Sequence, residues 1–272
     1  MIFSENRISQ KHLEELNSLL AERDKEILHS LEKCRYMTSQ HIRRLHFDEH
    51  ISHVAAIRAA NRGLVKLQGY GLIAALHRRI GGIKGGSDSN VCFLSEAGNR
   101  LLHMGSPDKR PRKRLFEPSR TFLKHTLGIT EIYVRITEIC REHAMQQIKT
   151  ELEPDCWRGY TDSDGKRAVL KPDILTVIAD WEYEYSYFFE VDLDTESLPA
   201  VLEKGRRYAC YYRASNAGKK EPEFPLVVWI VPNHNRKESL RRHIAGCHEL
   251  RPKHIFLVIV QDEFEMLLRR EV

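Results

Sequence analysis

Three acidic residues occupy the ends of two apolar runs, where carboxylates are uncommon. Asp173 follows Lys171 and Pro172 and precedes the run ILTVIA, whereas Glu190 and Asp192 close the segment YSYFFEVD. Acidic side chains form strands poorly and are seldom buried alone. These three therefore need solvent, basic partners or a ligand.

The two runs predict a β-hairpin that turns near Trp181 and Glu184. In that register Asp173 lies opposite the segment from Glu190 to Asp192, and residues 190 and 192 share a face because strand side chains alternate. Converging carboxylates can hold Mg²⁺ or Mn²⁺, which activates water against a phosphodiester. The alternative is that the acids are polar strand ends, solvated or paired with nearby Lys and Arg.

A helix is expected to follow, because LPAVLEKGRRYACYY at 198–212 carries apolar residues at helical spacing. Lys204 and Tyr208 are one helical turn apart, so both can face the acidic residues. The lysine can then help to hold a scissile phosphate, and the tyrosine can donate a hydrogen bond. Ordinary packing of Tyr208 in a core is the alternative.

The segments around the hairpin predict a mixed sheet flanked by helices. A helix is expected over 122–145, a first strand from QIKTELEP and the segment near Trp157, and a polar turn at TDSDGK. The runs FPLVVWIVP and HIFLVIV indicate buried strands, and the basic segment NRKESLRRHIAG between them indicates a crossover helix.

Positive charge is concentrated in the N-terminal half. Residues 24–120 contain 18 Lys and Arg against 9 Asp and Glu, a net charge of +9, whereas residues 121–272 contain 22 against 25, a net charge of −3. A polyanion is drawn first to the positive segment. Solvated helix faces would give the same excess, so charge alone leaves both interpretations open.

The order of elements in this half is typical of a winged helix-turn-helix. Helical spacing covers 13–31, Thr38 and Ser39 cap a short helix, and a third helical segment covers 51–68. Two strands are expected at 72–76 and 90–94, around the loop GGIKGGS. In such folds the third helix enters the major groove and the wing follows the backbone or the minor groove.

The expected DNA contacts are basic and amide side chains on the third helix and the wing. Together they form an electrostatic footprint that single residues do not, although a winged helix can also serve protein contacts alone. The candidates are Arg58, Asn61, Arg62, Lys66, Arg78, Arg79 and Lys84.

The whole chain divides into four expected parts. These are an N-terminal helical extension at 1–23, the winged helix-turn-helix domain at 24–104, a basic linker at 105–120 and an α/β domain at 121–272. The hydrophobic content of 42% is that of a globular protein, and the longest apolar runs fall short of the roughly 20 residues of a membrane helix. Six separated cysteines without a CxxC pair and the absence of a visible secretion signal predict a cytoplasmic protein. The N-terminal extension is a candidate for homodimer formation.

Several of these segments resemble the replication-relaxation family of plasmids and other mobile elements. The similarity rests on LKPD, FFEVDLDTES, EKGRRYACYY and HTLGITEIYV, and on the wing segment GLIAALHRRIGGIKGGSDSNVCFLSEAGNRLL, and it covers about residues 24–260. It implies a winged helix joined to a domain like the PD-(D/E)XK nucleases, an α+β protein overall. It also implies a role in replication, DNA relaxation or transfer, with double-stranded DNA and replication or conjugation proteins as partners.

The resemblance assigns roles to the acidic residues as well. Asp173 matches the acid of the Pro-Asp pair and Glu190 the second acid, whereas Asp192 stands where that family of nucleases has a lysine. Lys204 can replace that lysine from the next helix, and Glu131 can approach the site. The missing lysine favours a DNA-binding factor with a degenerate nuclease-like domain and no cofactor. The intact acids favour the alternative, a Mg²⁺- or Mn²⁺-dependent nuclease or nickase.

Overall fold

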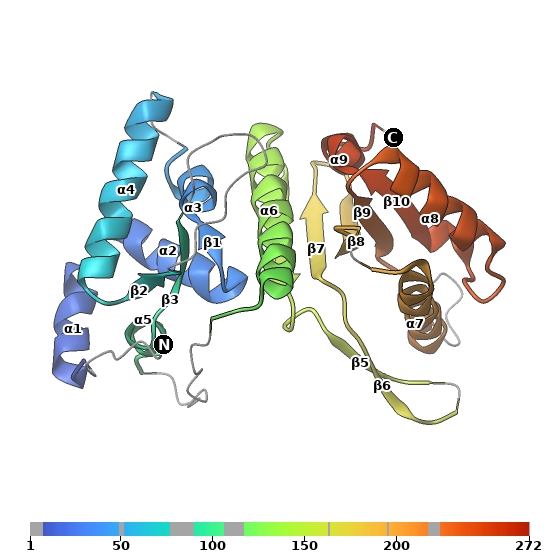
Figure 1. Ribbon diagram of the computed structural model, residues 1–272, viewed down its shortest axis with the longest axis horizontal. Coiled ribbons are helices and arrows are strands. Elements are labelled where there is room, and N and C mark those ends of the chain that lie inside the picture. Colours follow the sequence, from blue (N-terminus) through green and yellow to red (C-terminus); the bar gives the residue numbers. More distant parts are fainter. Residues whose placement is uncertain are drawn as a thin grey trace. The chain divides into compact units, whose positions relative to one another are not determined.

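The computed structural model describes residues 8–48, 52–76, 90–105, 117–162, 164–194, 196–216 and 224–271. The chain forms two compact units, Met1–Val134 and Arg135–Val272 (Figure 1). The division falls within helix α6 (Arg120–Glu142), whereas the sequence prediction places a boundary ahead of this helix. Within the described residues, no helix combines the length and the apolar character needed to cross a lipid bilayer.

The first unit is mainly helical and contains a small antiparallel sheet. Its strands lie in the order β1 (Met37–Thr38), β3 (Val91–Leu94) and β2 (Ile73–Ala75), and the β2–β3 pairing confirms the two strands expected there. Residues 77–89, which contain the expected wing loop, lie outside the described residues. The helices before α6 are α1 (Gln10–Leu19), α2 (Glu22–Cys34), α3 (Ser39–His46), α4 (His53–Gly69) and α5 (Glu96–Leu102).

Hydroxyl side chains fix where several of these helices begin. Thr38 caps α3 by accepting from the backbone N–H of His41, as the sequence predicts, and Ser52 caps α4 in the same way. Each such bond satisfies one of the backbone donors that a helix leaves free at its N-terminus. Gly63 lies within α4, and a Cβ at this position would be 3.3 Å from the ring of Phe47. The helix therefore packs closely here, which explains a glycine that costs about 1 kcal/mol in helix propensity.

The second unit is built on a five-stranded mixed sheet, as the sequence predicts. Its strands lie in the order β10 (Phe256–Val260), β9 (Leu226–Val231), β8 (Glu184–Val191), β7 (Ile174–Ala179) and β4 (Gln146–Leu152). The β8–β9 and β9–β10 pairs are parallel and the other two are antiparallel. Residue Ile174 pairs with Phe189, so the predicted register of the hairpin is confirmed.

Helices cover the sheet of the second unit. Side chains of α7 (Leu198–Asn216) and α8 (His234–Gly246) share one apolar core with Phe188 and Trp229 of the sheet. Phe189, whose side chain points to the opposite face, contacts Phe264 of α9 (Phe264–Leu268). A separate two-stranded ribbon, β5 (Arg158–Thr161) and β6 (Arg167–Leu170), brackets the predicted polar turn. Two short 3₁₀ helices, Lys253–Ile255 and Gln261–Glu263, flank β10.

Candidate active site and nucleic-acid interface

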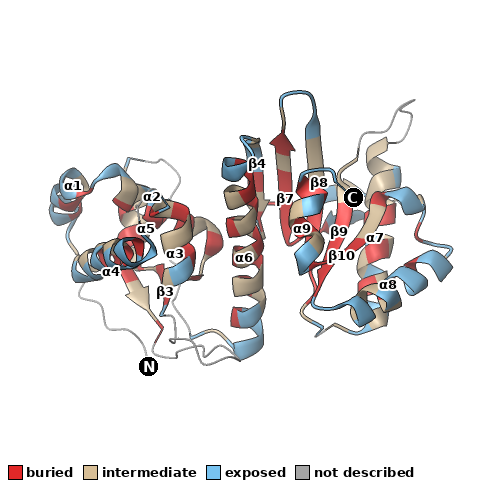
Figure 2. Cartoon of the chain, turned by 90° about the horizontal axis from the view of Figure 1, so that it is seen from above, coloured by how far each residue is buried: buried red, intermediate tan, exposed pale blue. Residues whose placement is uncertain are grey.

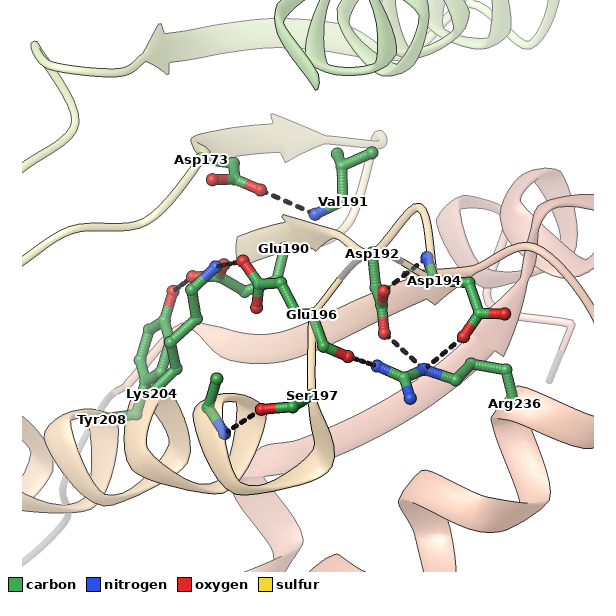
Figure 3. A network of polar contacts seen from close by, with 11 residues as sticks. Asp173, Glu190, Val191, Asp192, Asp194, Glu196, Ser197, Lys204, Tyr208 and Arg236 are labelled. Atoms are coloured by element: carbon green, nitrogen blue, oxygen red, sulfur yellow. Dashed lines mark hydrogen bonds and ion pairs between the residues drawn. The ribbon is translucent and has the colours of Figure 1, made fainter. Parts of the chain in front are cut away.

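Asp173 is held at the beginning of β7, against the end of β8. Its carboxylate Oδ2 accepts a hydrogen bond from the backbone N–H of Val191 at 2.7 Å (Figure 3). Its carbonyl oxygen accepts from the backbone N–H of Glu153 at 3.0 Å, and the thiol of Cys156 donates to the carbonyl oxygen of Pro172. Only 5% of Asp173 is exposed, so its carboxylate is fixed inside the unit.

Glu190 lies on β8 and faces α7, because its side chain alternates with that of Phe189. It is 2% exposed, and both of its carboxylate oxygens accept hydrogen bonds from α7. The hydroxyl of Tyr208 donates to Oε1 at 2.6 Å and the ammonium of Lys204 donates to Oε2 at 3.0 Å (Figure 3). Lys204 also donates to Glu196 at 2.9 Å. Lys204 and Tyr208 of α7 thus contact Glu190 of β8, as the helical spacing predicts.

Burial is the largest influence on the pKa values of Glu190, Lys204 and Tyr208. Burial and the nearby charge of Asp173 raise the pKa of Glu190 to about 8, even though Lys204 and Tyr208 lower it. Burial also acts against the charge of Lys204, but Glu190, Asp173 and Glu196 together raise the pKa of its ammonium. Burial and the charge of Glu190 raise the pKa of Tyr208 well above its ordinary value, so its hydroxyl stays protonated and donates the hydrogen bond to Glu190. With Asp173 and Glu190 both ionised, the cluster would carry more negative charge than Lys204 alone compensates, which is why Glu190 keeps its proton up to a high pH.

Asp192 is arranged differently from the prediction. Its Oδ2 accepts from the guanidinium of Arg236 at 2.8 Å, and its Oδ1 accepts from the backbone N–H of Asp194. In Figure 3 its side chain points to Arg236, whereas that of Glu190 points to Lys204 and Tyr208. Among the described residues, the groups of ligand atoms within 4.8 Å of one another do not include Asp173, Glu190 and Asp192 together.

The reason is that Asp192 lies beyond the last residue of β8, where the chain leaves the sheet. Asp194 adopts a left-handed backbone conformation with φ 61°, and Arg236 also donates to the carbonyl oxygen of Glu196 at 2.6 Å. Arg236 therefore secures the segment that leads from β8 to α7. This segment carries Glu196, whose carboxylate binds Lys204.

Glu196 and Arg236 were not identified from the sequence. The signal for Arg236 is its place in the first turn of α8, the helix that follows β9, since the carboxyl ends of neighbouring parallel strands lie at the same edge of a sheet. Glu196 has a weaker signal, its position just ahead of the helix that carries Lys204.

The DNA contacts predicted on the third helical segment, 51–68, lie on α4 of the structure and fall into two groups. Arg58, Asn61 and Arg62 of α4 are exposed. Figure 2 shows exposed stretches along this helix. Lys66 instead donates to Asp24 at 2.6 Å, which ties α4 to α2. The three wing residues, Arg78, Arg79 and Lys84, lie outside the described residues.

Glu131 is bound to two residues of α3, within the first unit. Its carboxylate accepts from Arg44 at 2.7 Å and lies 3.2 Å from Nε2 of His41. Burial opposes its ionisation, but the bonds from His41 and Arg44 lower the pKa of Glu131 overall. Glu131 thus joins the first part of α6 to α3.

Comparison with known proteins gives one match. The profile of the replication-relaxation family matches residues 28–227, most of the chain. No curated protein matches the chain, and no solved structure does. By this match, the chain belongs to the replication-relaxation family.

Proposed function

We propose that this protein binds double-stranded DNA of a plasmid or other mobile element through helix α4 and acts there in replication, relaxation or transfer. Family membership indicates a role in the replication or relaxation of mobile elements. The observation that carries DNA binding is the exposed face of α4, where Arg58, Asn61 and Arg62 lie together. Among the described residues, neither arginine has an ion-pair partner.

The chemistry of α4 suits a duplex groove. The helix has no Asp or Glu in its sequence HVAAIRAANRGLVKLQG, so no charge on it repels phosphate. Arginine can bind guanine bidentately and asparagine can bind adenine, whereas apolar side chains contact the thymine methyl group. Val54 and Val65 are more than half exposed and supply such apolar surface. In the winged helix that we propose for this unit, α4 is the groove-binding helix, and β2 and β3 lead to the wing.

The second unit is proposed to be a degenerate domain of the PD-(D/E)XK type. Both oxygens of Glu190 are bonded to Tyr208 and Lys204, and Asp192 is bonded to Arg236. A divalent cation would have to displace Lys204 to use both oxygens of Glu190. This arrangement supports a scaffold for partners or for self-association.

Cleavage is the second candidate function, and one observation favours it. Burial and the charge of Asp173 raise the pKa of Glu190 to about 8, so its ionised form is unfavourable beside Lys204 alone, and a divalent cation would stabilise it. Asp173 and Glu190 would hold Mg²⁺ or Mn²⁺, which supplies Lewis-acid activation of water and phosphate. Lys204 would then neutralise charge on the scissile phosphate, and Tyr208 would orient Glu190.

DNA binding is tested by measuring duplex affinity over a series of salt concentrations. Arg58→Ala combined with Arg62→Ala should reduce the slope of log affinity against log salt by up to about 1.8, since each lost phosphate contact lowers it by about 0.9. Lys11→Ala combined with Lys124→Ala is the matched control, because both lysines are exposed in the same unit. Equal affinities and equal slopes for the two double variants would reject α4 as the DNA-binding helix.

Cleavage is tested on supercoiled plasmid that carries the origin of the mobile element. The wild-type protein with Mg²⁺ or Mn²⁺ should leave the plasmid intact if the second unit is a scaffold. Nicking that requires the metal ion and disappears in Asp173→Ala would establish the second candidate function instead.

A further inference from the structure

An open depression lies on the second unit, formed by α7 and the segment before β10. Arg213, Arg251, Pro252 and Lys253 line it, and it encloses roughly 600 Å³. Arg213 comes from the last turn of α7, whereas Arg251 and Lys253 flank Pro252 ahead of β10. All three cationic side chains are exposed.

These three cations differ from their neighbours because they have no carboxylate partner within the described residues. Arg213 donates to the thiol sulfur of Cys210 at 3.2 Å, and Lys253 donates to the carbonyl oxygen of Ala245. Neither acceptor is a carboxylate. Many other cations of the unit are paired, as Arg206 is with Glu249 and Lys237 is with Glu263.

The local excess of positive charge stands against an acidic background. Residues 135–272 carry 21 Lys and Arg against 24 Asp and Glu, so the depression is positive in a unit that is negative overall. Cations that surround one hollow and have no carboxylate partner in the described part of the chain attract an external anion.

Packing keeps the cations together. Leu250 is fully buried, and a Cβ added to Gly205 would lie 2.8 Å from its side chain. The segment that carries Arg251 and Lys253 is thus anchored directly on α7, the helix that carries Arg213.

We propose that this depression binds the phosphodiester backbone of nucleic acid, as a second contact in addition to α4. The hollow is open and its cations are exposed, whereas small ligands are held in enclosed pockets by converging polar groups. The guanidinium group of arginine can donate two parallel hydrogen bonds to one phosphate. Contacts to successive phosphates of a nucleic-acid backbone can be made on an open surface and need no enclosed pocket. The inference rests on the proposed DNA binding but not on α4 or on cleavage.

The test compares four full-length proteins for duplex affinity against salt concentration. The depression variant carries Arg213→Gln, Arg251→Gln and Lys253→Gln. The matched control carries Lys166→Gln, Arg167→Gln and Arg242→Gln, which remove three exposed charges elsewhere on the same unit. Wild-type protein and the double variant of α4, Arg58→Ala with Arg62→Ala, complete the set.

The depression variant should lower the salt slope by up to about 2.7, whereas the control should leave it close to wild type. Equal slopes for the depression variant and its control would overturn the inference. An effect in the depression variant with none in the α4 variant would refute the proposed role of α4 and leave this inference standing. Absence of duplex binding by the wild-type protein would overturn both.

A second arm separates nucleic acid from a free anion. Inorganic phosphate, added at constant ionic strength, should show no saturable binding by calorimetry. Saturable phosphate binding that the depression variant loses would make this a small-anion site and overturn the proposal for nucleic acid.

Discussion

Replacement of Glu190 by Gln tests the electrostatics of the buried cluster most directly. Glu190 is 2% exposed, and burial together with the charge of Asp173 raises its pKa from 4.5 to about 8. A carboxyl group with a raised pKa binds its proton more tightly in the folded state than in the unfolded state. Its stabilising contribution is therefore complete below about pH 4.5 and is lost as the pH rises to about 8.

The size of the effect follows from the shift. One pH unit corresponds to about 1.4 kcal/mol, so the free energy of unfolding should fall by roughly 3 kcal/mol between pH 5 and pH 8 because of Glu190 alone. The amide introduced by Glu190→Gln has no such titration. It retains the shape of the carboxyl group and an oxygen that can accept from Lys204 or Tyr208.

Tryptophan fluorescence during urea unfolding is the appropriate assay, because Trp157, Trp181 and Trp229 all lie in the second unit. Relative to wild type, Glu190→Gln should gain roughly 3 kcal/mol of stability between pH 5 and pH 8. Glu184→Gln, at an exposed position of the same strand, is the control for general effects of charge removal. A difference between wild type and Glu190→Gln that stays constant over this range would refute the reasoning and show that Lys204 keeps Glu190 ionised.

Three further predictions concern packing, a buried ion pair and the thiols. Gly98→Ala should destabilise the first unit by about 2 kcal/mol or more in circular-dichroism melts, because a Cβ there would lie 2.1 Å from the carbonyl oxygen of Leu72. Arg236→Gln should cost roughly 3–5 kcal/mol in urea unfolding, since it leaves a buried carboxylate without its cation. A thiol reagent at pH 7.5 should modify Cys210 and Cys247 quickly and the other four cysteines only after unfolding, because those four are buried and burial raises their pKa values.

Each of these has an internal comparison. A Cβ at Gly69 would have no atom within 4 Å, so Gly69→Ala should leave the first unit as stable or slightly more stable. Arg241 pairs with Glu238 on an exposed surface, so Arg241→Gln should change stability by no more than about 1 kcal/mol. Similar losses for the two glycine variants, or for the two arginine variants, would contradict the packing and burial seen here. Rapid reaction of more than two thiols in the folded protein would contradict the burial of the other four cysteines.

The hairpin of the second unit was predictable because its signal is local. ILTVIA and YSYFFEV are dense in β-branched and aromatic residues, and the short turn between them determines the register. The ribbon of β5 and β6 carries no comparable signal, since RGYT and RAVL are short and largely polar or exposed. The strand pair of β2 and β3 was predictable in the same way as the hairpin, from two short apolar runs on either side of a glycine-rich segment.

In the candidate site, too, contacts between neighbouring segments were predictable and a contact with a distant segment was not. Hairpin register and helical spacing were sufficient to bring Lys204 and Tyr208 to Glu190. They could not give the partner of Asp192, because Arg236 comes from a helix more than forty residues later in the chain. Only the parallel pairing of β8 with β9 brings that helix beside Asp192, and strand order depends on contacts that no short segment encodes.

Ion pairing also ranks the cations of this protein as DNA ligands. A cation that is already bonded to a carboxylate must give up that bond to bind phosphate, whereas an unpaired cation releases only loosely associated counterions. Lys66 is bonded to Asp24, but Arg62, one turn earlier on the same helix, has no such partner among the described residues. Arg62→Gln should therefore weaken duplex binding clearly more than Lys66→Gln, although each removes one charge from α4. Equal losses of affinity in a binding titration at fixed salt would show that DNA responds to the total charge of the helix and not to its unpaired residues.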